Sequence, residues 1–535
     1  GAGESHCLVV KSDGTVWAWG LDTYSQLGYQ IPVGNPTPLS VGGLTGVAAV
    51  APGRDHNIAL KSDGTVWAWG SNVVGQLGDG TTVDRPTPVQ VSGLTGVVAI
   101  ESGATSSIAL KSDGTVWAWG GNTNGQLGDG TGINKPTPVQ VSGLTGVIAI
   151  TAHSTSARAL KSDGTVWAWG ANDYGQLGDG TTTNRLSPVQ VRGLTGVVAI
   201  TGGFHHSLAV KSDGTVWAWG WNSYGQLGDG TILDKLTPVQ VSGLTGVVAV
   251  SAHEHSLALK SDGSVWAWGW NTNGQLGDGT TTNRLTPFQM SSLTGVTAID
   301  AGNSHSLALK SDGTVWAWGD NTYGQLGGVA AQNSTTPVKA SGLTGVLAIA
   351  TNHLHNLALQ APDAPSLVGA KPANAEKDVP TNTAISWVAV PSVNYDLQLS
   401  TNANFATLAA NVSNSSSTTY TPTTPLATNT TYYWRIRSRL MTLTSAWVTG
   451  TFTTVAPPKP AGGESPATVT PPAVTPPASV TPPAVVTPPV NVPPAQAPST
   501  GFSGLWVIII AFATAVLVAT IMAFIFLRIL KKQKA

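Results

Sequence analysis

The decapeptide KSDGTVWAWG, at residues 61–70, decides the fold of most of this 535-residue chain. It occurs seven times at a spacing of 50 residues, apart from one interval of 49, and one copy carries Ser264 in place of the threonine. A fixed period of this size indicates a repeated supersecondary unit that buries its apolar faces against its neighbours. The copies begin at Lys11, Lys61, Lys111, Lys161, Lys211, Lys260 and Lys310.

Each period is predicted to hold four short strands. In the second copy, an apolar run over 57–61 and the segment 65–69 flank an Asp-Gly pair, which is the strongest short-range signal for a β-hairpin. Residues 86–91 are extended and bounded by proline, as suits an edge strand, and 97–100 form a buried strand. Because no helical pattern is present, four-stranded units of this length predict the blades of a β-propeller.

Four short motifs recur within the repeat. In the seventh copy they are His305-Ser306-Leu307-Ala308-Leu309, Asp312-Gly313, Trp318-Gly319 and Gly324-Gln325-Leu326-Gly327. With these motifs the repeat resembles the bacterial form of the regulator of chromosome condensation family. The resemblance covers about residues 1–360 and implies a seven-bladed propeller. WD-repeat and kelch propellers are disfavoured, because the period exceeds that of the former and the glycine and Trp-Asp signatures differ.

The hairpin strand that opens each unit is present eight times, from residues 6–10 to residues 355–359, although seven blades need only seven. We expect seven blades, closed by pairing of the N- and C-terminal strands. The alternative is a longer array.

Composition excludes several classes of protein. Only 10% of the residues are charged, and 26 Lys and Arg balance 27 Asp and Glu, so the basic patch that nucleic-acid binding needs is not expected. The single cysteine, Cys7, permits no disulfide within the chain, and the usual zinc spacings are absent. The sequence therefore predicts neither a cofactor nor a metal.

A second domain is predicted over 366–455, where alternating strands are separated by turn-rich gaps. This segment resembles a fibronectin type III domain, a β-sandwich in which Trp387 would be the core tryptophan and Tyr432 would occupy the tyrosine-corner position. The resemblance implies a spacer module more than a binding one.

The C-terminal part predicts a membrane anchor. Residues 456–503 are rich in Thr-Pro-Pro repeats and predict an extended polyproline stalk. Residues 505–527 carry no charge and are long enough for one transmembrane helix, and the basic tail 528–535 places the C-terminus in the cytoplasm. Everything N-terminal then lies outside the cell, which requires a secretory signal. Since the sequence begins with Gly1, a leader is expected to have been processed or truncated.

The recurring polar residues favour structural roles over chemical ones. Ser106 and Ser156 replace a histidine found in the same position of the other units, which suits a hydrogen-bonding slot, and the hairpin aspartates suit turns. The loop Gly-Gln-Leu-Gly-Asp-Gly lacks the helix of a phosphate site and the ligand spacing of a calcium site. No catalytic, cofactor-binding or metal-binding residue is predicted. The histidines are His6, His56, His206, His255, His305 and His355.

The positions that differ between units indicate where a partner binds. The residue after each Trp-Gly pair and the residue three further on vary from copy to copy, whereas the frame around them does not. Varying loop residues on a constant scaffold are typical of a binding surface, and Trp and Tyr are typical interface anchors. An alternative is that these aromatic rings pack on neighbouring blades. The candidate contacts are Tyr174, Trp221, Tyr224, Trp270 and Tyr323.

These features predict a non-catalytic, membrane-anchored cell-surface protein whose extracellular propeller recognises a protein or a glycan. The family resemblance also implies binding work: some bacterial propellers of this kind resemble β-lactamase inhibitors, and eukaryotic ones act as guanine nucleotide exchange factors. Exchange activity is disfavoured because its GTPase partners are intracellular. The alternatives are a structural adhesion or surface-layer component and, less favoured, a glycan-active enzyme, which would need paired carboxylates in one cleft.

Overall fold

The computed structural model describes residues 3–10, 14–28, 35–328, 332–352, 354–360, 363–390, 393–440 and 443–457. These residues form thirty-seven strands, and no helix is found among them. The all-β class predicted from the sequence is confirmed.

Six four-stranded sheets follow one another along the chain, and in each of them consecutive strands pair in sequence order. The four strands predicted for each period are thereby confirmed. The sheets are β4–β7 (Val47–Pro52, His56–Lys61, Val66–Gly70, Arg85–Gln90), β8–β11 (Val97–Ser102, Ser106–Lys111, Val116–Gly120, Lys135–Gln140), β12–β15 (Val147–His153, Ser156–Lys161, Val166–Gly170, Arg185–Gln190), β16–β19 (Val197–Gly202, His206–Lys211, Val216–Gly220, Lys235–Gln240), β20–β23 (Val247–Ala252, His255–Lys260, Val265–Gly269, Arg284–Gln289) and β24–β27 (Val296–Ala301, His305–Lys310, Val315–Gly319, Ser334–Lys339).

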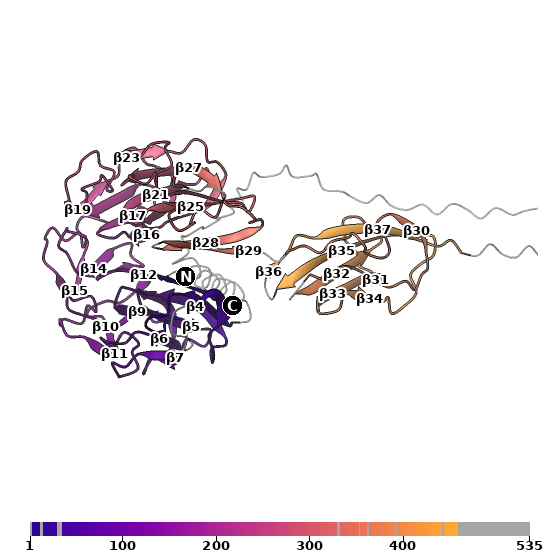
Figure 1. Ribbon diagram of the computed structural model, residues 1–535, viewed down its shortest axis with the longest axis horizontal. Helices are drawn as coiled ribbons and strands as arrows, with labels where there is room; N and C mark the ends of the chain where they lie inside the picture. The colour runs from indigo at the N-terminus through magenta and orange to yellow at the C-terminus, as the bar shows by residue number, and fades with distance from the viewer. Residues whose placement is uncertain are drawn as a thin grey trace, which may run out of the picture.

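The sheets stand around a common centre, as blades of a propeller do. The first strand of each sheet lies toward the middle and the fourth lies on the rim (Figure 1). The proline-bearing strand is always the fourth, where its missing N–H groups face no ladder partner. The edge position predicted for this strand is therefore confirmed.

The hairpin turn between the second and third strands is held by its own side chains. Asp63 accepts hydrogen bonds from the backbone nitrogen and the hydroxyl of Thr65, at 2.9 and 2.6 Å. Gly64 has a φ of 80°, which glycine adopts without a steric cost. The same pair of bonds recurs in the turns at Asp113, Asp163, Asp213, Asp262 and Asp312, which confirms the turn role predicted for these aspartates.

Each third strand buries one indole against the preceding sheet. Trp69 lies in one core cluster with Leu8, Val16 and Ala18 of the sheet before it, so a large side chain fills the space over small ones. Its Nε1 donates a hydrogen bond to the backbone oxygen of Gln26 at 3.0 Å. The equivalent indoles, all of them 0% exposed, make the same bond to the preceding sheet: Trp119, Trp169, Trp219, Trp268 and Trp318.

The two ends of the array form incomplete sheets. The first has three strands, β1–β3 (His6–Val10, Val16–Gly20, Asn35–Ser40), and the last has two, β28 and β29 (Val346–Asn352, His355–Gln360). The expected pairing between N- and C-terminal strands is not present among the described residues, because β1 pairs with β2 and β28 with β29. The two sheets are instead joined by a hydrogen bond between Nε2 of His355 and the backbone oxygen of His6, at 3.0 Å. The count of seven blades therefore stays a prediction.

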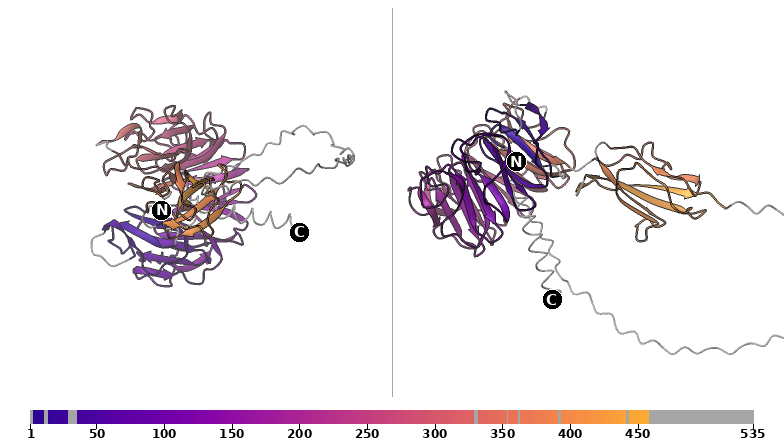
Figure 2. Two further views of the ribbon diagram at one scale, coloured as in Figure 1. Left: turned by 90° about the vertical axis from the view of Figure 1, so that its right-hand side faces the viewer. Right: turned by 90° about the horizontal axis from the view of Figure 1, so that it is seen from below.

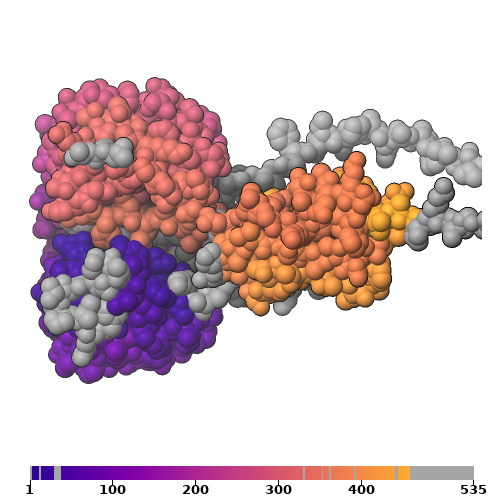
Figure 3. Space-filling view, turned by 45° about the vertical axis from the view of Figure 1, so that its right-hand side comes forward, coloured from indigo at the N-terminus to yellow at the C-terminus, as the bar shows by residue number. Residues whose placement is uncertain are grey.

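A second domain follows and forms a body distinct from the ring (Figures 2 and 3). Its larger sheet has the order β30-β37-β35-β32-β33, with β36 paired to β35, and its smaller sheet joins β31 to β34. Trp387 beside β31 packs edge-on against Tyr395 of β32, at 5.3 Å between ring centroids. The strands are β30 (Glu376–Val379), β31 (Ile385–Ser386), β32 (Asn394–Ser400), β33 (Ala410–Ser415), β34 (Thr419–Tyr420), β35 (Thr431–Leu440), β36 (Leu443–Thr444) and β37 (Val448–Thr454).

The two positions predicted for this domain have the expected geometry. Trp387 is 7% exposed and belongs to the core. The hydroxyl of Tyr432 accepts a hydrogen bond from the backbone nitrogen of Ala427, five residues upstream, at 3.0 Å. This is the bond that defines a tyrosine corner. Membership of the fibronectin type III family stays a prediction.

Nothing that the structure describes forms a helix able to span a bilayer. Apart from its first two residues, the predicted stalk over 456–503 lies outside the described residues, and so do the predicted transmembrane segment 505–527 and the tail 528–535.

Candidate functional site

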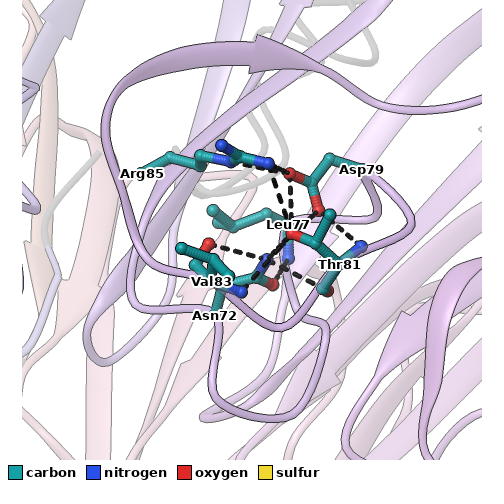
Figure 4. A network of polar contacts seen from close by, with 6 residues as sticks. All are labelled: Asn72, Leu77, Asp79, Thr81, Val83 and Arg85. Carbon is teal, nitrogen blue, oxygen red and sulfur yellow. Dashed lines mark hydrogen bonds and ion pairs between the residues drawn. The ribbon is translucent and has the colours of Figure 1, made fainter.

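The long loop between the third and fourth strands is built around one buried asparagine, shown for Asn72 in Figure 4. Its Nδ2 donates to Oδ1 of Asp79 at 3.2 Å and to the backbone oxygens of Thr81 and Val83 at 3.1 Å. Its Oδ1 accepts a hydrogen bond from the backbone nitrogen of Leu77 at 3.0 Å. The loop is therefore part of the rigid frame. The same contacts recur at Asn122, Asn172, Asn222 and Asn271.

The aspartate of this loop is occupied by the loop itself. Asp79 accepts hydrogen bonds from Thr81 and forms an ion pair with Arg85 at 2.7 Å. Burial acts to raise the pKa of Asp79, but these hydrogen bonds outweigh it and the pKa is lowered. Among the described residues, no group of three or more His, Cys, Asp and Glu side chains could hold a metal ion. The carboxylate of Asp79 therefore stabilises its own loop.

A glutamine ties each loop to the following sheet. In the fifth copy, Oε1 of Gln226 accepts a hydrogen bond from the backbone nitrogen of Tyr224 at 3.0 Å. The backbone oxygen of Gln226 accepts from Nε1 of Trp268 at 2.8 Å and from the hydroxyl of Ser256 at 2.9 Å, both on the next sheet. The backbone at the variable position 224 is thus fixed from two sides.

Four of the five aromatic residues singled out in the sequence come together in one cluster. Trp270 stacks on Tyr224 at 5.9 Å between centroids, and Tyr224 meets Trp221 edge-on at 5.2 Å. Trp221 lies 5.9 Å from Tyr174 and 5.9 Å from His205. We call Tyr174, His205, Trp221, Tyr224 and Trp270 together the aromatic surface. It extends over three consecutive sheets, because Tyr174 follows β14, Trp221 and Tyr224 follow β18, and Trp270 follows β22.

The aromatic surface is accessible but firmly packed. Tyr174 is 36% exposed, and Trp221, Tyr224 and Trp270 are half-buried. The rings pack on neighbouring blades, as one alternative expected, and still reach the surface, so their role as partner contacts stays a prediction. Burial lowers the pKa of His205, so this ring is neutral at pH 7.

Tyr323 does not join the cluster. Its side chain is 72% exposed, and no contact of its ring with another aromatic ring occurs in the described part of the chain. On the preceding sheet, the corresponding position is Asn273, so no neighbouring ring is available to extend the row. Tyr323 occupies the same position of the repeat as Tyr174 and Tyr224 and is exposed, but its ring lies outside the cluster.

The cluster continues inward through residues that the sequence analysis missed. Phe204 lies 4.4 Å from His205 and stacks on His253 at 5.9 Å, and His153 lies 5.4 Å from His253. These residues lie in or beside the connections between first and second strands, where the second copy carries Gly53, Arg54 and Asp55. The signal in the sequence is the variation of this connection between copies, as between Gly53-Arg54-Asp55 and Gly203-Phe204-His205.

The inward end of the cluster meets a central cavity of about 480 Å³. Phe204, His153 and His253 are among its lining residues. The walls come from the first strands of the sheets, and most of them are Val, Ile, Ala and Gly.

The recurring histidines join consecutive sheets. Nε2 of His206 lies 3.0 Å from the hydroxyl of Ser256 on the next sheet, and that hydroxyl donates to the backbone oxygen of Gln226. Burial is the largest cause that lowers the pKa of His206, to about 3, so the ring is neutral. These contacts confirm the hydrogen-bonding slot predicted from the sequence. The same arrangement, with Ser or Asn as partner, holds for His6, His56, His255 and His305.

Comparison with known proteins agrees with this architecture. Among solved structures, the chain resembles human WBSCR16 (TM-score 0.55, 23% identity, covering 65% of this chain and 99% of that chain). It also resembles yeast RCC1 (Prp20), solved bound to Kap60 (TM-score 0.53, 23% identity, 65% and 89%). A structure of Prp20p from Saccharomyces cerevisiae, titled for its binding to Gsp1p and histones, gives a TM-score of 0.53 at 22% identity (66% and 93%). At these identities the likeness shows the fold alone.

Family comparison identifies the repeat itself. No curated protein matches the chain. Residues 296–325 and 312–359 each match a regulator of chromosome condensation (RCC1) repeat. Residues 1–291, more than half of the chain, match the RCC1-like domain, and the chain therefore belongs to the RCC1-like domain family.

Proposed function

We propose that this protein is a membrane-anchored cell-surface binding protein, and that its propeller recognises a partner protein through the aromatic surface. One observation carries the proposal: Tyr174, Trp221, Tyr224 and Trp270, which come from three consecutive repeats, form one continuous row of rings on a fixed loop platform. The proposal includes no catalytic step.

The packing of the aromatic surface favours a protein partner over a glycan. Interfaces between proteins are enriched in aromatic residues at their core and depleted in charge. The rings of this surface are half-buried and touch one another, so a partner needs to order few side chains when it binds. Preorganisation of this kind raises affinity because less conformational entropy is lost.

The remaining segments would present this surface away from the membrane. We propose that the second domain is a fibronectin type III-like spacer, that 456–503 form an extended stalk and that 505–527 cross the membrane once, with the basic tail inside the cell. Gsp1p and histones, which Prp20p binds, belong to that protein and do not enter this proposal, because a likeness at 22% identity shows the fold alone.

A pull-down with the full-length chain against extracellular proteins, in parallel with a glycan array, tests the proposal. We expect a protein partner that is retained by the chain and lost with the double variant Trp221→Ala and Trp270→Ala. Trp217→Ala is the matched control, since it removes a half-buried indole from the other end of the same strand. Retained binding by the double variant would rule out the aromatic surface, and binding to glycans alone would replace the protein partner.

Topology is tested separately. Protease added to intact cells should remove the propeller, because the proposal places it outside. Protection of the propeller would overturn the cell-surface location without affecting the aromatic surface as a binding site.

A further inference from the structure

The first strands of the sheets present one side chain each to the central cavity at the same register position. The position is defined by its ladder partner, the third residue of the second strand, as in the pair Glu101 and Ile108. It holds alanine on β4 and β28 and a polar residue on the five strands between them. All of these positions line the cavity. The polar residues are Glu101, Thr151, Thr201, Ser251 and Asp300.

The two carboxyls at this level have opposite environments. Asp300 is satisfied by its neighbours, because it accepts hydrogen bonds from the hydroxyl of Ser251 at 2.8 Å and from the backbone nitrogen of Thr351 at 2.8 Å. Glu101 is only 8% exposed, and its Oε1 is fully buried without a hydrogen-bond donor among the described residues. Burial alone raises the pKa of Glu101 well above its usual value, since no charged neighbour offsets it.

An orphaned carboxyl inside a cavity is costly unless something supplies the missing donor. A buried acceptor without a partner loses its hydration and gains nothing in return. The same frame shows at Asp300 that a carboxyl at this level can be satisfied from the strands on either side. Glu101 therefore differs from Asp300 because it lines the cavity while no neighbouring strand supplies a donor to its buried Oε1.

The chemistry of the walls selects the kind of ligand. Three carboxyl side chains line the cavity against one guanidinium, that of Arg54, which is already bound to Asp55 at 2.8 Å. The buried Arg158 is not among the lining residues, and its Nε donates to the hydroxyl of Ser207, while its Nη1 lies beside the lining residue Gly202 without a hydrogen-bond partner among the described residues. The remaining walls are mainly apolar, and the volume of about 480 Å³ lies within the range of small-molecule sites.

We propose that the central cavity binds a small alkylamine, whose ammonium group donates hydrogen bonds to Glu101 and whose carbon chain lies against the apolar first strands. A charge-assisted bond of this type is among the strongest that a buried carboxyl can make. The ring of Phe204 lines the same cavity, and the face of such a ring attracts a cation. The site is distinct from the aromatic surface and does not depend on the proposed function.

Calorimetric titration of the full-length chain with n-butylamine, 1-butanol and butanoate tests the charge preference directly. These probes share one carbon chain and differ in the charge of the head group. We expect saturable binding of n-butylamine, weaker binding of 1-butanol and none of butanoate. Equal binding of the amine and the alcohol, or no binding of the amine, would overturn the proposal, and neither outcome depends on a variant.

Glu101→Gln then tests the residue. It keeps the shape of the side chain and removes the buried acid, so the fold should be retained. We expect it to weaken n-butylamine binding by about 10- to 100-fold and to leave 1-butanol unchanged. The matched control Glu254→Gln, outside the cavity lining, should bind n-butylamine as the unmodified chain does. Undiminished amine binding by Glu101→Gln would disprove the assignment.

The amine-binding cavity and the partner-binding aromatic surface can be tested independently of each other. Trp221→Ala should leave n-butylamine binding unchanged, because Trp221 does not line the cavity. A loss of amine binding in this variant would move the amine site to the aromatic surface and overturn the cavity proposal.

Discussion

Three tryptophans at alternate positions of one strand and its end have three different environments. Trp219 in β18 is 0% exposed and donates to the backbone of the preceding sheet at 2.9 Å. Trp217, two residues before it, is half-buried near the hairpin turn, where the ammonium of Lys211 lies 5.7 Å from its ring centroid. Trp221, two residues after it, belongs to the aromatic surface.

The comparison of these three tryptophans separates residues that build the blade from a residue that can contact a partner. Trp217 and Trp219 occur in every copy of the repeat, whereas the position of Trp221 holds Leu, Ser, Gly, Ala or Asp in the others, apart from Trp270. The equivalents of Trp219 from Trp69 to Trp318 make the same bond to the preceding sheet, so this repeated residue describes how a blade is built. Only the varied residue differs between blades, so it can specify a partner.

The largest loss of stability is expected at low pH, because the buried histidines that respond to it lie in most of the sheets of the propeller. The buried histidines have pKa values lowered, mainly by burial, to about 4 for His6 and about 3 for His56, His206 and His255, and also lowered for His305. The unfolded chain binds protons below about pH 6.5 that the folded frame does not bind. Each histidine therefore costs about 1.4 kcal/mol of stability per pH unit below that value.

Two buried carboxyls oppose this effect in part, because burial raises the pKa of Asp300 to about 6 and that of Glu101 well above its usual value. Thermal unfolding followed from pH 7.5 to pH 4.5 measures the sum. The second domain is an internal control, since all ten histidines precede it and the pKa of Asp396, lowered to about 2, delays its acid response until below about pH 4. A propeller that kept its full stability at pH 5 would contradict the prediction.

Next in size is the difference between Trp219 and Trp221. Trp219→Ala should lower the free energy of unfolding by about 3–5 kcal/mol, because it leaves a cavity between two sheets and removes one of the two hydrogen bonds that the Gln176 carbonyl accepts. Trp221→Ala should lower it by less, because this indole is half-buried and its loss removes ring contacts with Tyr174, His205 and Tyr224 but leaves no cavity between sheets. Chemical denaturation of the two variants gives both values, and equal losses would show that frame and surface are not distinct.

The asparagine at the centre of each loop allows a sharper comparison. Asn222→Ala and Asn122→Ala remove the same hydrogen bonds from two loops, so each should destabilise the protein by about 2–3 kcal/mol. Only Asn222 lies between two aromatic residues, Trp221 and Tyr224. We therefore expect Asn222→Ala alone to weaken partner binding, measured by the pull-down. An equal effect of both variants on binding would place the partner elsewhere.

The smallest effect is expected at the hairpin turns. Lys211→Ala removes a contact with the ring of Trp217 and an ion pair with Asp213 at 3.7 Å, both at the surface. Such contacts contribute about 0.5–1 kcal/mol and about 0–1 kcal/mol. Denaturation should show a loss below about 1.5 kcal/mol, and partner binding should not change. Weakened binding in this variant would place the partner on the turns.

The features that recur in the copies of the repeat could be predicted from the sequence alone. Local geometry accounts for the Asp-Gly turn, the proline-bearing edge strand and the interval between Trp67 and Trp69. The same residue pattern recurs in each copy of the repeat. The hydrogen-bonding role of the histidines could also be inferred, because serine replaces histidine in two copies. The aromatic candidates were found from variation between copies, and four of the five lie together.

Relations between repeats could not be obtained in this way. Tyr174 and Trp221 are 47 positions apart, and Glu101 and Asp300 are 199 apart, so their distances depend on how whole sheets stack around the ring. The closing contact between His355 and His6 joins the two ends of the array, where the sequence suggested strand pairing.

What the amino-acid sequence determined by itself is the blade, because turn chemistry, strand alternation and the need to bury one indole per unit act over a few residues. The stacking of the blades decided which of the varied side chains meet. It brought Trp221 and Trp270 into one row of rings through Tyr224, and it left Tyr323 alone. It also gave Asp300 its hydrogen-bond donors and left Oε1 of Glu101 without one, because the donors to Asp300 come from the two neighbouring sheets, about fifty residues away in sequence, which only the stacking places beside it.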